Sequence, residues 1–275
     1  GLKILPAFQQ VYSGFATMRG NLYAFENLSE DLHDASDALQ KRRDIQDDIA
    51  TITFQDLITV KNISFQYPNS VISALQDVCI DIPYKGVIGL VGSSGSGKST
   101  LADMIMGLLK PTHGSITIDK EILTNSNLRA WQDKIGFVSQ RIFLSDTSVR
   151  QNVAFGIQED EIDDDSVNKA LELANLKSFV DTLPDGTETY VGERGIQLSG
   201  GQMQRIGIAR ALYHDAEVLV FDEATSSLDG LTEKLIMEAI NKFFREKTII
   251  LIAHRLATVK KCDVLYLLDK GRLID

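Results

Sequence analysis

Apolar side chains recur at helical spacing through the first 45 residues of the chain. Positions seven residues apart are apolar from Ile4 to Leu39, and further apolar residues fill the intermediate places of the same seam. The seven-residue series consists of Ile4, Val11, Met18, Phe25, Leu32 and Leu39, and the intermediate places hold Phe8, Phe15, Leu22 and Leu28. The pattern predicts one helix of about 35 residues and about 50 Å. The cations of Lys41–Arg43 would end it.

Two interpretations of this helix are open. It can fold back onto its own domain, or it can be an arm that packs against other helices. The length and the aromatic character of the seam favour the arm. We therefore expect residues 1–50 to form a helical extension and residues 51–275 to form the main domain.

Beyond residue 51 the pattern changes to short apolar runs separated by polar turns and helical segments. Alternation in Leu57–Phe65 and in Val78–Pro83 predicts strands. Further strands are predicted at Gly86–Val91, Ser115–Asp119, Ile135–Gln140, Val218–Glu223, Thr248–His254 and Asp263–Leu268. Helices are predicted at Leu101–Leu109, over about 148–182, and at Met203–Leu212. This order of elements is typical of an α/β fold with a parallel core.

Composition and charge narrow the class of protein. A length of 275 residues with 44% hydrophobic content suits one large globular domain, or one domain with an extension. The net charge of −10 argues against nucleic acid as a partner. No apolar run approaches the length of about 18 residues that a membrane helix needs, so we expect the chain as given to be soluble. Cys79 and Cys262 lack C-x-x-C spacing, which excludes the usual zinc cluster, and we expect both to be buried.

A phosphate-binding pattern, G-x-x-x-x-G-K-[ST], lies between a predicted strand and a predicted helix. Its residues are Gly92, Ser93, Ser94, Gly95, Ser96, Gly97, Lys98, Ser99 and Thr100. Small residues let backbone N–H groups turn inward around phosphate oxygens, and the positive end of the next helix adds to this nest. Lys98 would neutralise phosphate charge, and Ser99 would bind Mg²⁺. The alternative is a flexible loop that binds nothing, which the flanking strand and helix disfavour.

A second glycine-rich segment, Leu198–Gln202, precedes the predicted helix Met203–Leu212. The free N–H groups and the positive dipole end of such a helix make it a second candidate anion site. The chain nevertheless has only one phosphate loop.

Polar side chains also end several of the predicted strands. Asp222 and Glu223 follow one apolar run, and ligands of open parallel sheets bind at this end of the strands. Asp222 would hold the metal or its waters, and Glu223 would polarise an attacking water. Gln140 ends another strand, where its amide can bind Mg²⁺. His254 could contact the γ-phosphate or position the water, although a lone His after an apolar run is more often structural.

In this order, the motifs resemble the nucleotide-binding domain of an ATP-binding cassette transporter of the exporter type. The motifs are Gly92–Thr100, Gln140, Leu198–Gln202, Val218–Glu223, Ser226–Asp229 and His254. Leu198–Gln202 is the most specific, because the phosphate loop marks a wider group of NTPases. The resemblance covers residues from about 57 to the end. It implies a P-loop NTPase (RecA-like) core with a parallel sheet, an N-terminal antiparallel β subdomain, and an inserted α-helical subdomain at about 141–204.

The resemblance further implies that the domain binds and hydrolyses ATP with Mg²⁺. Tyr67 would stack on the adenine. The expected metal-binding residues are Ser99, Gln140 and Asp222. The expected catalytic residues are Lys98, Gln140 as the Q-loop glutamine, Glu223 as the general base, and His254.

A second copy of the domain is an implied partner. The resemblance places Ser199, Gly200 and Gly201, with Gln202 in the same motif, against the γ-phosphate of ATP bound to another chain. Asp229 would lie at that dimer seam. Each chain has one phosphate loop and one further anion-binding helix start. This is explained if two chains meet head to tail, so that each completes the site of the other. A homodimer is the simpler expectation.

A membrane domain is the other implied partner. Val191–Gly195 resembles the exporter element that contacts the transmembrane part, and residues 1 to about 45 resemble the continuation of the last membrane helix. The chain would then be part of a larger polypeptide at the cytoplasmic face of a membrane. Two alternatives are a soluble cassette ATPase that acts on DNA or ribosomes, and a nucleotide-binding scaffold without hydrolysis. The single cassette, the acidic charge and Val191–Gly195 weigh against the first.

Overall fold

The computed structural model describes residues 6, 8–22, 51–68, 70–192, 195–224, 230–253 and 259–274, without the side chains at 231, 232 and 235. The chain divides into two compact units, Gly1–Ala50 and Thr51–Asp275. Each unit is described by itself.

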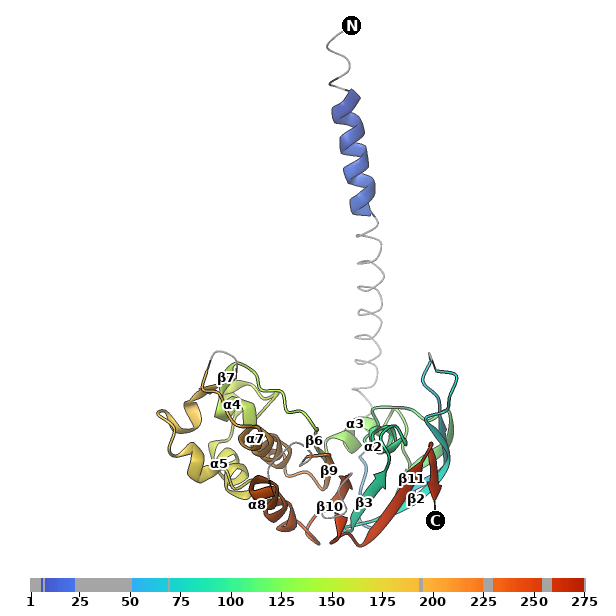
Figure 1. Cartoon of the computed structure of the whole chain (residues 1–275), viewed down its shortest axis with the longest axis vertical. Helices are drawn as coiled ribbons and strands as arrows, with labels where there is room; N and C mark the ends of the chain where they lie inside the picture. Colours follow the sequence, from blue (N-terminus) through green and yellow to red (C-terminus); the bar gives the residue numbers. More distant parts are fainter. Residues whose placement is uncertain are drawn as a thin grey trace. The chain divides into compact units, whose positions relative to one another are not determined.

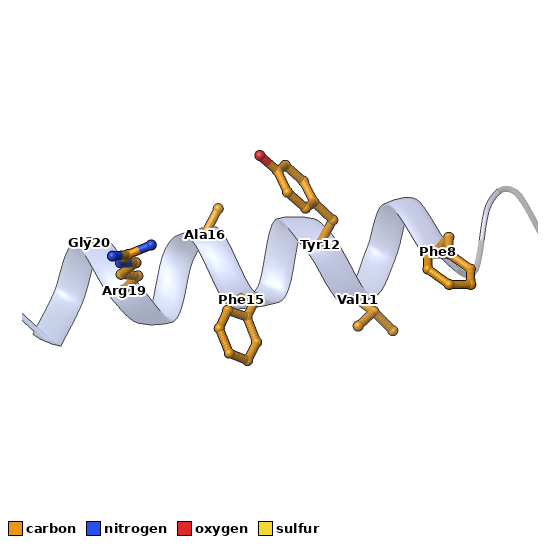
Figure 2. Close-up of a pocket in the computed structure, with 7 residues that line it drawn as sticks. All are labelled: Phe8, Val11, Tyr12, Phe15, Ala16, Arg19 and Gly20. Atoms are coloured by element: carbon orange, nitrogen blue, oxygen red, sulfur yellow. The ribbon is translucent and has the colours of Figure 1, made fainter.

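In the first unit, residues 8–22 form a helix (Figure 1). Val11 and Phe15 point to one side of this helix, while Tyr12 and Ala16 point to the opposite side (Figure 2). Phe8, Val11, Tyr12, Phe15, Met18 and Leu22 are all exposed. The expected helix is thus present over part of its predicted length, and large apolar side chains lie on more than one of its sides. The remaining positions of the predicted seam, Ile4, Phe25, Leu28, Leu32 and Leu39, lie outside the described residues.

The second unit is built around a largely parallel sheet. Its strand order is β12-β11-β3-β10-β9-β6, and all neighbouring pairs are parallel except β11 with β12. The strands are β3 (Val87–Gly92), β6 (Ile135–Val138), β9 (Val218–Asp222), β10 (Thr248–Ile252), β11 (Val264–Asp269) and β12 (Arg272–Ile274). The central strands are apolar without alternation because both faces of the sheet are covered. In β9, Leu219 and Phe221 belong to one hydrophobic core, and Val218 and Val220 to the other.

An antiparallel sheet of order β2-β1-β4-β5 covers one face of this parallel sheet. Its strands are β1 (Leu57–Phe65), β2 (Leu75–Pro83), β4 (His113–Ile118) and β5 (Glu121–Ile122). In β2, Val78 and Ile80 are buried, whereas Cys79 between them is exposed. The expectation of two buried cysteines is therefore wrong, because strand alternation turns Cys79 outward and Cys262 is only partly buried.

The helices divide between the two faces of the parallel sheet. They are α2 (Lys98–Ile105), α3 (Leu128–Gln132), α4 (Val149–Val153), α5 (Asp164–Leu173), α6 (Lys177–Val180), α7 (Gly200–Tyr213) and α8 (Gly230–Asn241). Helices α4, α5 and α7 gather at one end of the second unit, away from β2 and β11 (Figure 1). With the short strands β7 (Thr147–Ser148) and β8 (Tyr190–Val191), they form a mainly helical part inserted between β6 and β9. The α/β fold with parallel, antiparallel and helical parts is thus confirmed.

Helix α2 begins earlier and ends earlier than the apolar pattern predicts. It starts at Lys98, directly after the phosphate loop, and stops before Gly107, whose φ of 70° is left-handed. Trp131 is fully buried, and its indole N–H donates to the carbonyl oxygen of Ile105 at 2.7 Å. This bond satisfies a carbonyl at the end of α2 and fixes the helix that follows the phosphate loop.

Asp119 anchors the start of β1 by accepting three backbone hydrogen bonds. Its carboxylate accepts from the N–H groups of Gln55, Asp56 and Leu57 at 3.0, 2.9 and 2.9 Å. Burial alone would raise the pKa of Asp119, but the three donors together lower it below its ordinary value. Because the folded-state pKa is the lower one, this stabilisation is present above the unfolded-state pKa and is lost as the pH falls through the folded-state pKa.

We therefore predict that Asp119→Asn lowers the free energy of unfolding by about 1 kcal/mol at pH 7, since one N–H would then face an amide N–H₂ group. The difference from the parent should shrink below about pH 4, where the parent carboxylate also becomes protonated. Urea unfolding followed by the fluorescence of Trp131 measures this at both pH values. A difference that does not change with pH would contradict the role of the charge.

Candidate nucleotide-binding site

Backbone angles and close contacts together require glycine at both ends of the phosphate loop. Gly92 ends β3 with a φ of 151°, and a Cβ there would lie 2.2 Å from the carbonyl oxygen of Leu268. Gly97 caps α2 with a φ of 104°, and a Cβ there would lie 2.7 Å from the carbonyl oxygen of Ala74. The loop is thus held tightly at both ends. A loop with no fixed shape, the alternative left open by the sequence, does not match this geometry.

Lys98 crosses the loop from its position at the start of α2. The side chain is buried, and its ammonium group donates to the carbonyl oxygens of Gly92 and Ser93 at 3.1 and 2.7 Å. It also lies 3.4 Å from Oγ of Ser96, which is itself buried. Burial lowers the pKa of Lys98, and the neighbouring carboxylates Glu223 and Asp222 act in the opposite direction. The loop therefore holds a positive charge at its centre.

Asp222 lies at the carboxyl end of β9, which is separated from β3 in the sheet by β10. Burial raises the pKa of its carboxyl group, while a hydrogen bond from Ser99 lowers it. The charges of Glu223 and Asp103 add to the increase, and that of Lys98 opposes it. The hydroxyl of Ser99 therefore lies near the carboxylate of Asp222, as two oxygen ligands of one Mg²⁺ would.

Glu223 and Gln140 meet although 83 residues separate them in the chain. The amide Nε2 of Gln140 donates to Oε2 of Glu223 at 2.7 Å. Glu223 has a left-handed φ of 48°, and its N–H donates to the carbonyl oxygen of Ile252 at 3.0 Å, at the end of β10. This turn directly after β9 carries the Glu223 side chain to the phosphate loop, where it lines a pocket together with Lys98 and Ser99.

A pocket of about 280 Å³ lies over the phosphate loop. Its lining residues are Tyr67, Ala74, Ser94, Gly95, Gly97, Lys98, Ser99, Thr100 and Glu223. Tyr67 is partly exposed, its hydroxyl lies 3.2 Å from Oγ1 of Thr100, and its ring makes a T-shaped contact with the ring of Phe65. The sequence did not single out Ala74. Its only signal was its position immediately before β2, shortly after Tyr67.

The second glycine-rich segment forms a well-defined helix start. Ser199 caps α7: its hydroxyl accepts from the N–H of Gln202 at 3.3 Å, and its own N–H donates to Oε1 of Gln202 at 2.7 Å. This reciprocal pair is a capping box, so the side chain of Gln202 serves the helix end. Among the described residues that line the phosphate-loop pocket, none comes from Ser199–Gln202.

Some of the expected site residues lie outside the part of the chain that the structure describes. They are His254, Asp229, Ser226, Ser227 and Leu228, as well as Glu193 and Arg194 of the element Val191–Gly195. Within the described residues, no cluster of three or more His, Cys, Asp or Glu side chains is suited to a metal ion. No described helix is both long and apolar enough to span a bilayer.

A phosphate loop between a central parallel strand and a helix, with a carboxylate at the same edge of the sheet, defines a P-loop nucleotide-binding domain. The family model described as "ABC transporter" matches residues 75–226. This match includes the phosphate loop, Gln140, the cap of α7 and Glu223. The chain therefore belongs to the ABC transporter family, whose domains of this type bind ATP and are ATPases.

Similar proteins of known name agree with this family. The chain is 36% identical over its whole length to an ATP-dependent lipid A-core flippase of Alkalilimnicola ehrlichii, of which it covers 45%. It is 43% identical over 78% of its length to ABC transporter B family member 1 of Arabidopsis thaliana, of which it covers 17%. A solved structure of a bacterial Atm1-family ABC exporter with ATP bound matches 82% of this chain and 39% of that one, with 33% identity and a TM-score of 0.75. The chain thus spans less than half of each of these proteins.

Proposed function

We propose that this chain hydrolyses ATP to drive transport of a substrate across a membrane, as part of an exporter or flippase. The observation that carries the proposal is the contact between Gln140 and Glu223 at the edge of a pocket that also contains Lys98. It brings a candidate base, a candidate metal ligand and a phosphate-binding cation together. Such a constellation is suited to phosphoryl transfer to water.

The phosphate loop would bind the triphosphate of ATP through its N–H groups and the ammonium group of Lys98. The adenine would stack on Tyr67, whose ring is partly exposed at the pocket mouth. Ser99 and Asp222, which lie near one another, would hold Mg²⁺ with Gln140. The metal, when bound, neutralises charge on the β- and γ-phosphate oxygens.

Glu223 would accept a proton from the attacking water as the general base. Its carboxylate is at the pocket wall, and the amide of Gln140 donates to one of its oxygens. That hydrogen bond orients the carboxylate at the pocket wall. His254 stays a predicted member of this group.

A second nucleotide-binding domain would complete the site. The capping box satisfies the N–H of Gln202, while helix geometry directs the N–H groups of Gly200 and Gly201 outward along the axis of α7. These groups, with Ser199, would bind the γ-phosphate of ATP held by another chain, and Asp229 would lie nearby. A homodimer is the simpler assembly.

A transmembrane domain of the same transporter is the other proposed partner, which would place the ATPase domain at the cytoplasmic face of a membrane. The exposed aromatic helix of residues 8–22 would connect the two domains. The flippase and exporter names of the relatives favour transport over the alternative of a soluble switch on DNA or ribosomes. A longer reading frame that encodes six hydrophobic spans before residue 1 would support this, and a frame without them would overturn it.

Hydrolysis should depend on the divalent metal. We predict that phosphate release from ATP by the full-length protein falls to the buffer background when EDTA removes Mg²⁺, and returns when Mg²⁺ is added in excess. Release that continues in EDTA would contradict the proposed metal-binding group of Ser99, Asp222 and Gln140. Absence of release under all conditions would support a scaffold without hydrolysis.

A further inference from the structure

One side of helix α7 contacts the loop that follows β6. The contacts involve residues before Gln140 in the sequence and residues after it. The contacting residues are Gln204, Gly207 and Arg210, which are three positions apart and therefore lie along one side of the helix. None of the three lines the described pocket over the phosphate loop.

Gln204 holds the residue immediately before Gln140. It is buried, with 6% of its surface exposed, and its amide Nε2 donates to the carbonyl oxygen of Ser139 at 3.2 Å. The hydroxyl of Ser139 in turn donates to the carbonyl oxygen of Arg141 at 2.8 Å. The backbone on either side of Gln140 is thus tied together and then to α7.

Gly207 and Arg210 hold the residues just after Gln140. The side chain of Ile142 packs directly on Gly207, so that a Cβ at this position would lie 2.4 Å from Cδ1 of Ile142. The guanidinium of Arg210 donates to the carbonyl oxygen of Phe143 at 3.2 Å and to that of Asn152 at 2.9 Å.

Arg210 is itself firmly placed. Its guanidinium stacks on the ring of Phe155 at 4.5 Å and also donates to Oδ1 of the fully buried Asn152. The backbone N–H of Ser145 donates to Oδ1 of Asn152, and Nδ2 of Asn152 donates to the carbonyl oxygen of Ser145. Burial lowers the pKa of Arg210. The arginine therefore joins α7, α4 and the loop in one hydrogen-bonded group.

We propose that Gln204, Gly207 and Arg210 position Gln140, so that helix α7 fixes the Gln140 amide against the carboxylate of Glu223. This rests on the proposed function of Gln140 and Glu223. The residues between Ser139 and Ser145 form no helix or strand, so their backbone order depends on such contacts. A displacement of about 1 Å at a catalytic group is enough to slow a reaction considerably. Because Ser199 caps the start of the same helix, a movement of α7 would shift the Gln140 loop and the Ser199 cap together.

The test removes one hydrogen bond at a time in the full-length protein. Gln204→Leu is expected to lower kcat for ATP hydrolysis by about 5- to 10-fold and to leave KM within about 2-fold. The matched control is Gln132→Leu, because the Gln132 amide also donates to a backbone carbonyl, that of Gly107, which is not part of this loop. The control should keep the parent kcat. Gly207→Ala should also lower kcat, since Ile142 must move, even though alanine favours the helix.

A double variant separates positioning from general loss of structure. In a Gln140→Ala background, Gln204→Leu should change kcat by less than about 2-fold, because its effect passes through the missing amide. Equal effects in both backgrounds, or no effect of Gln204→Leu and Gly207→Ala in the parent, would overturn the proposal. If Glu223→Gln itself hydrolyses ATP normally, the proposed function fails instead. If Gln204→Leu does not fold, as judged by Trp131 fluorescence, the kcat of Gly207→Ala in the parent and in the Gln140→Ala background tests the proposal instead.

Discussion

Glu223→Gln is expected to slow ATP hydrolysis by about 100- to 10,000-fold and to leave ATP affinity within a few-fold of the parent. The amide has nearly the shape of the carboxylate but cannot accept a proton from water. The hydrogen bond from Gln140, 2.7 Å long in the parent, can persist to the amide oxygen, so the geometry should be kept. Phosphate release under single-turnover conditions and equilibrium binding of Mg-ATP measure the two effects separately.

The control for this substitution is Glu217→Gln. Glu217 lies just before the other end of β9 and pairs with Lys134 at 2.5 Å, away from the pocket. A partly exposed ion pair contributes little, so hydrolysis by this variant should be close to that of the parent. Equal loss of activity in the two variants would show that Glu223 acts through folding and not as a base.

The same variant tests the two-chain site. With hydrolysis blocked, Mg-ATP should hold two domains together, and light scattering should show a dimer of Glu223→Gln more readily than of the parent. The N-terminus of α7, which lies outside the described pocket, would then contact the partner's nucleotide. If the variant shows no dimer at saturating Mg-ATP, the proposed role of Ser199, Gly200 and Gly201 is wrong.

The positions of the strands could be predicted from sequence, because the burial of one or both faces of a sheet determines which residues of a strand are apolar. The run Leu57–Phe65 was predicted as a strand and is β1 without change of bounds. Continuous apolar runs marked β3, β9 and β10, because both of their faces are buried. Helix α8 and strand β12 were not predicted, although Gly230–Asn241 carries apolar residues at helical spacing. The beginning of α2 near Lys98 follows from the phosphate loop, whereas the apolar pattern alone starts only at Leu101.

The chemistry of the site was visible in the sequence, but its contacts were not. A motif assigns Lys98 to phosphate and Asp222 to metal, whereas no local pattern states that Gln140 donates to Glu223. That contact depends on the parallel pairing of β6 with β9, which is a long-range property. The left-handed φ of Glu223 is likewise set by its hydrogen bond to Ile252 and has no signal in a glutamate. Sequence reasoning also missed Gln204 and Arg210, because buried polar residues in a helix are recognised only by what they touch.

Lys98→Met is expected to weaken ATP binding by about 100-fold, since charge-assisted hydrogen bonds to phosphate are lost. Methionine is unbranched and can follow the path of the lysine stem through the loop. The substitution also removes the donor to the carbonyl oxygens of Gly92 and Ser93, which would then depend on water. Equilibrium binding of a fluorescent ATP analogue, with and without Mg²⁺, gives the change in affinity.

Lys98→Met should change the stability of the nucleotide-free protein much less than it changes the affinity for ATP. Burial lowers the pKa of Lys98, which means that the folded protein holds this charge at an energetic disadvantage relative to the unfolded chain. Removal of the charge relieves that disadvantage and offsets the two lost hydrogen bonds. The thermal midpoint, followed by Trp131 fluorescence, should therefore change by only a few degrees. The matched control Lys134→Met, which breaks the pair with Glu217, should keep the parent affinity. If Lys98→Met binds ATP as the parent does, or if it loses affinity only because it unfolds, the lysine is a structural element of the loop and not its phosphate ligand.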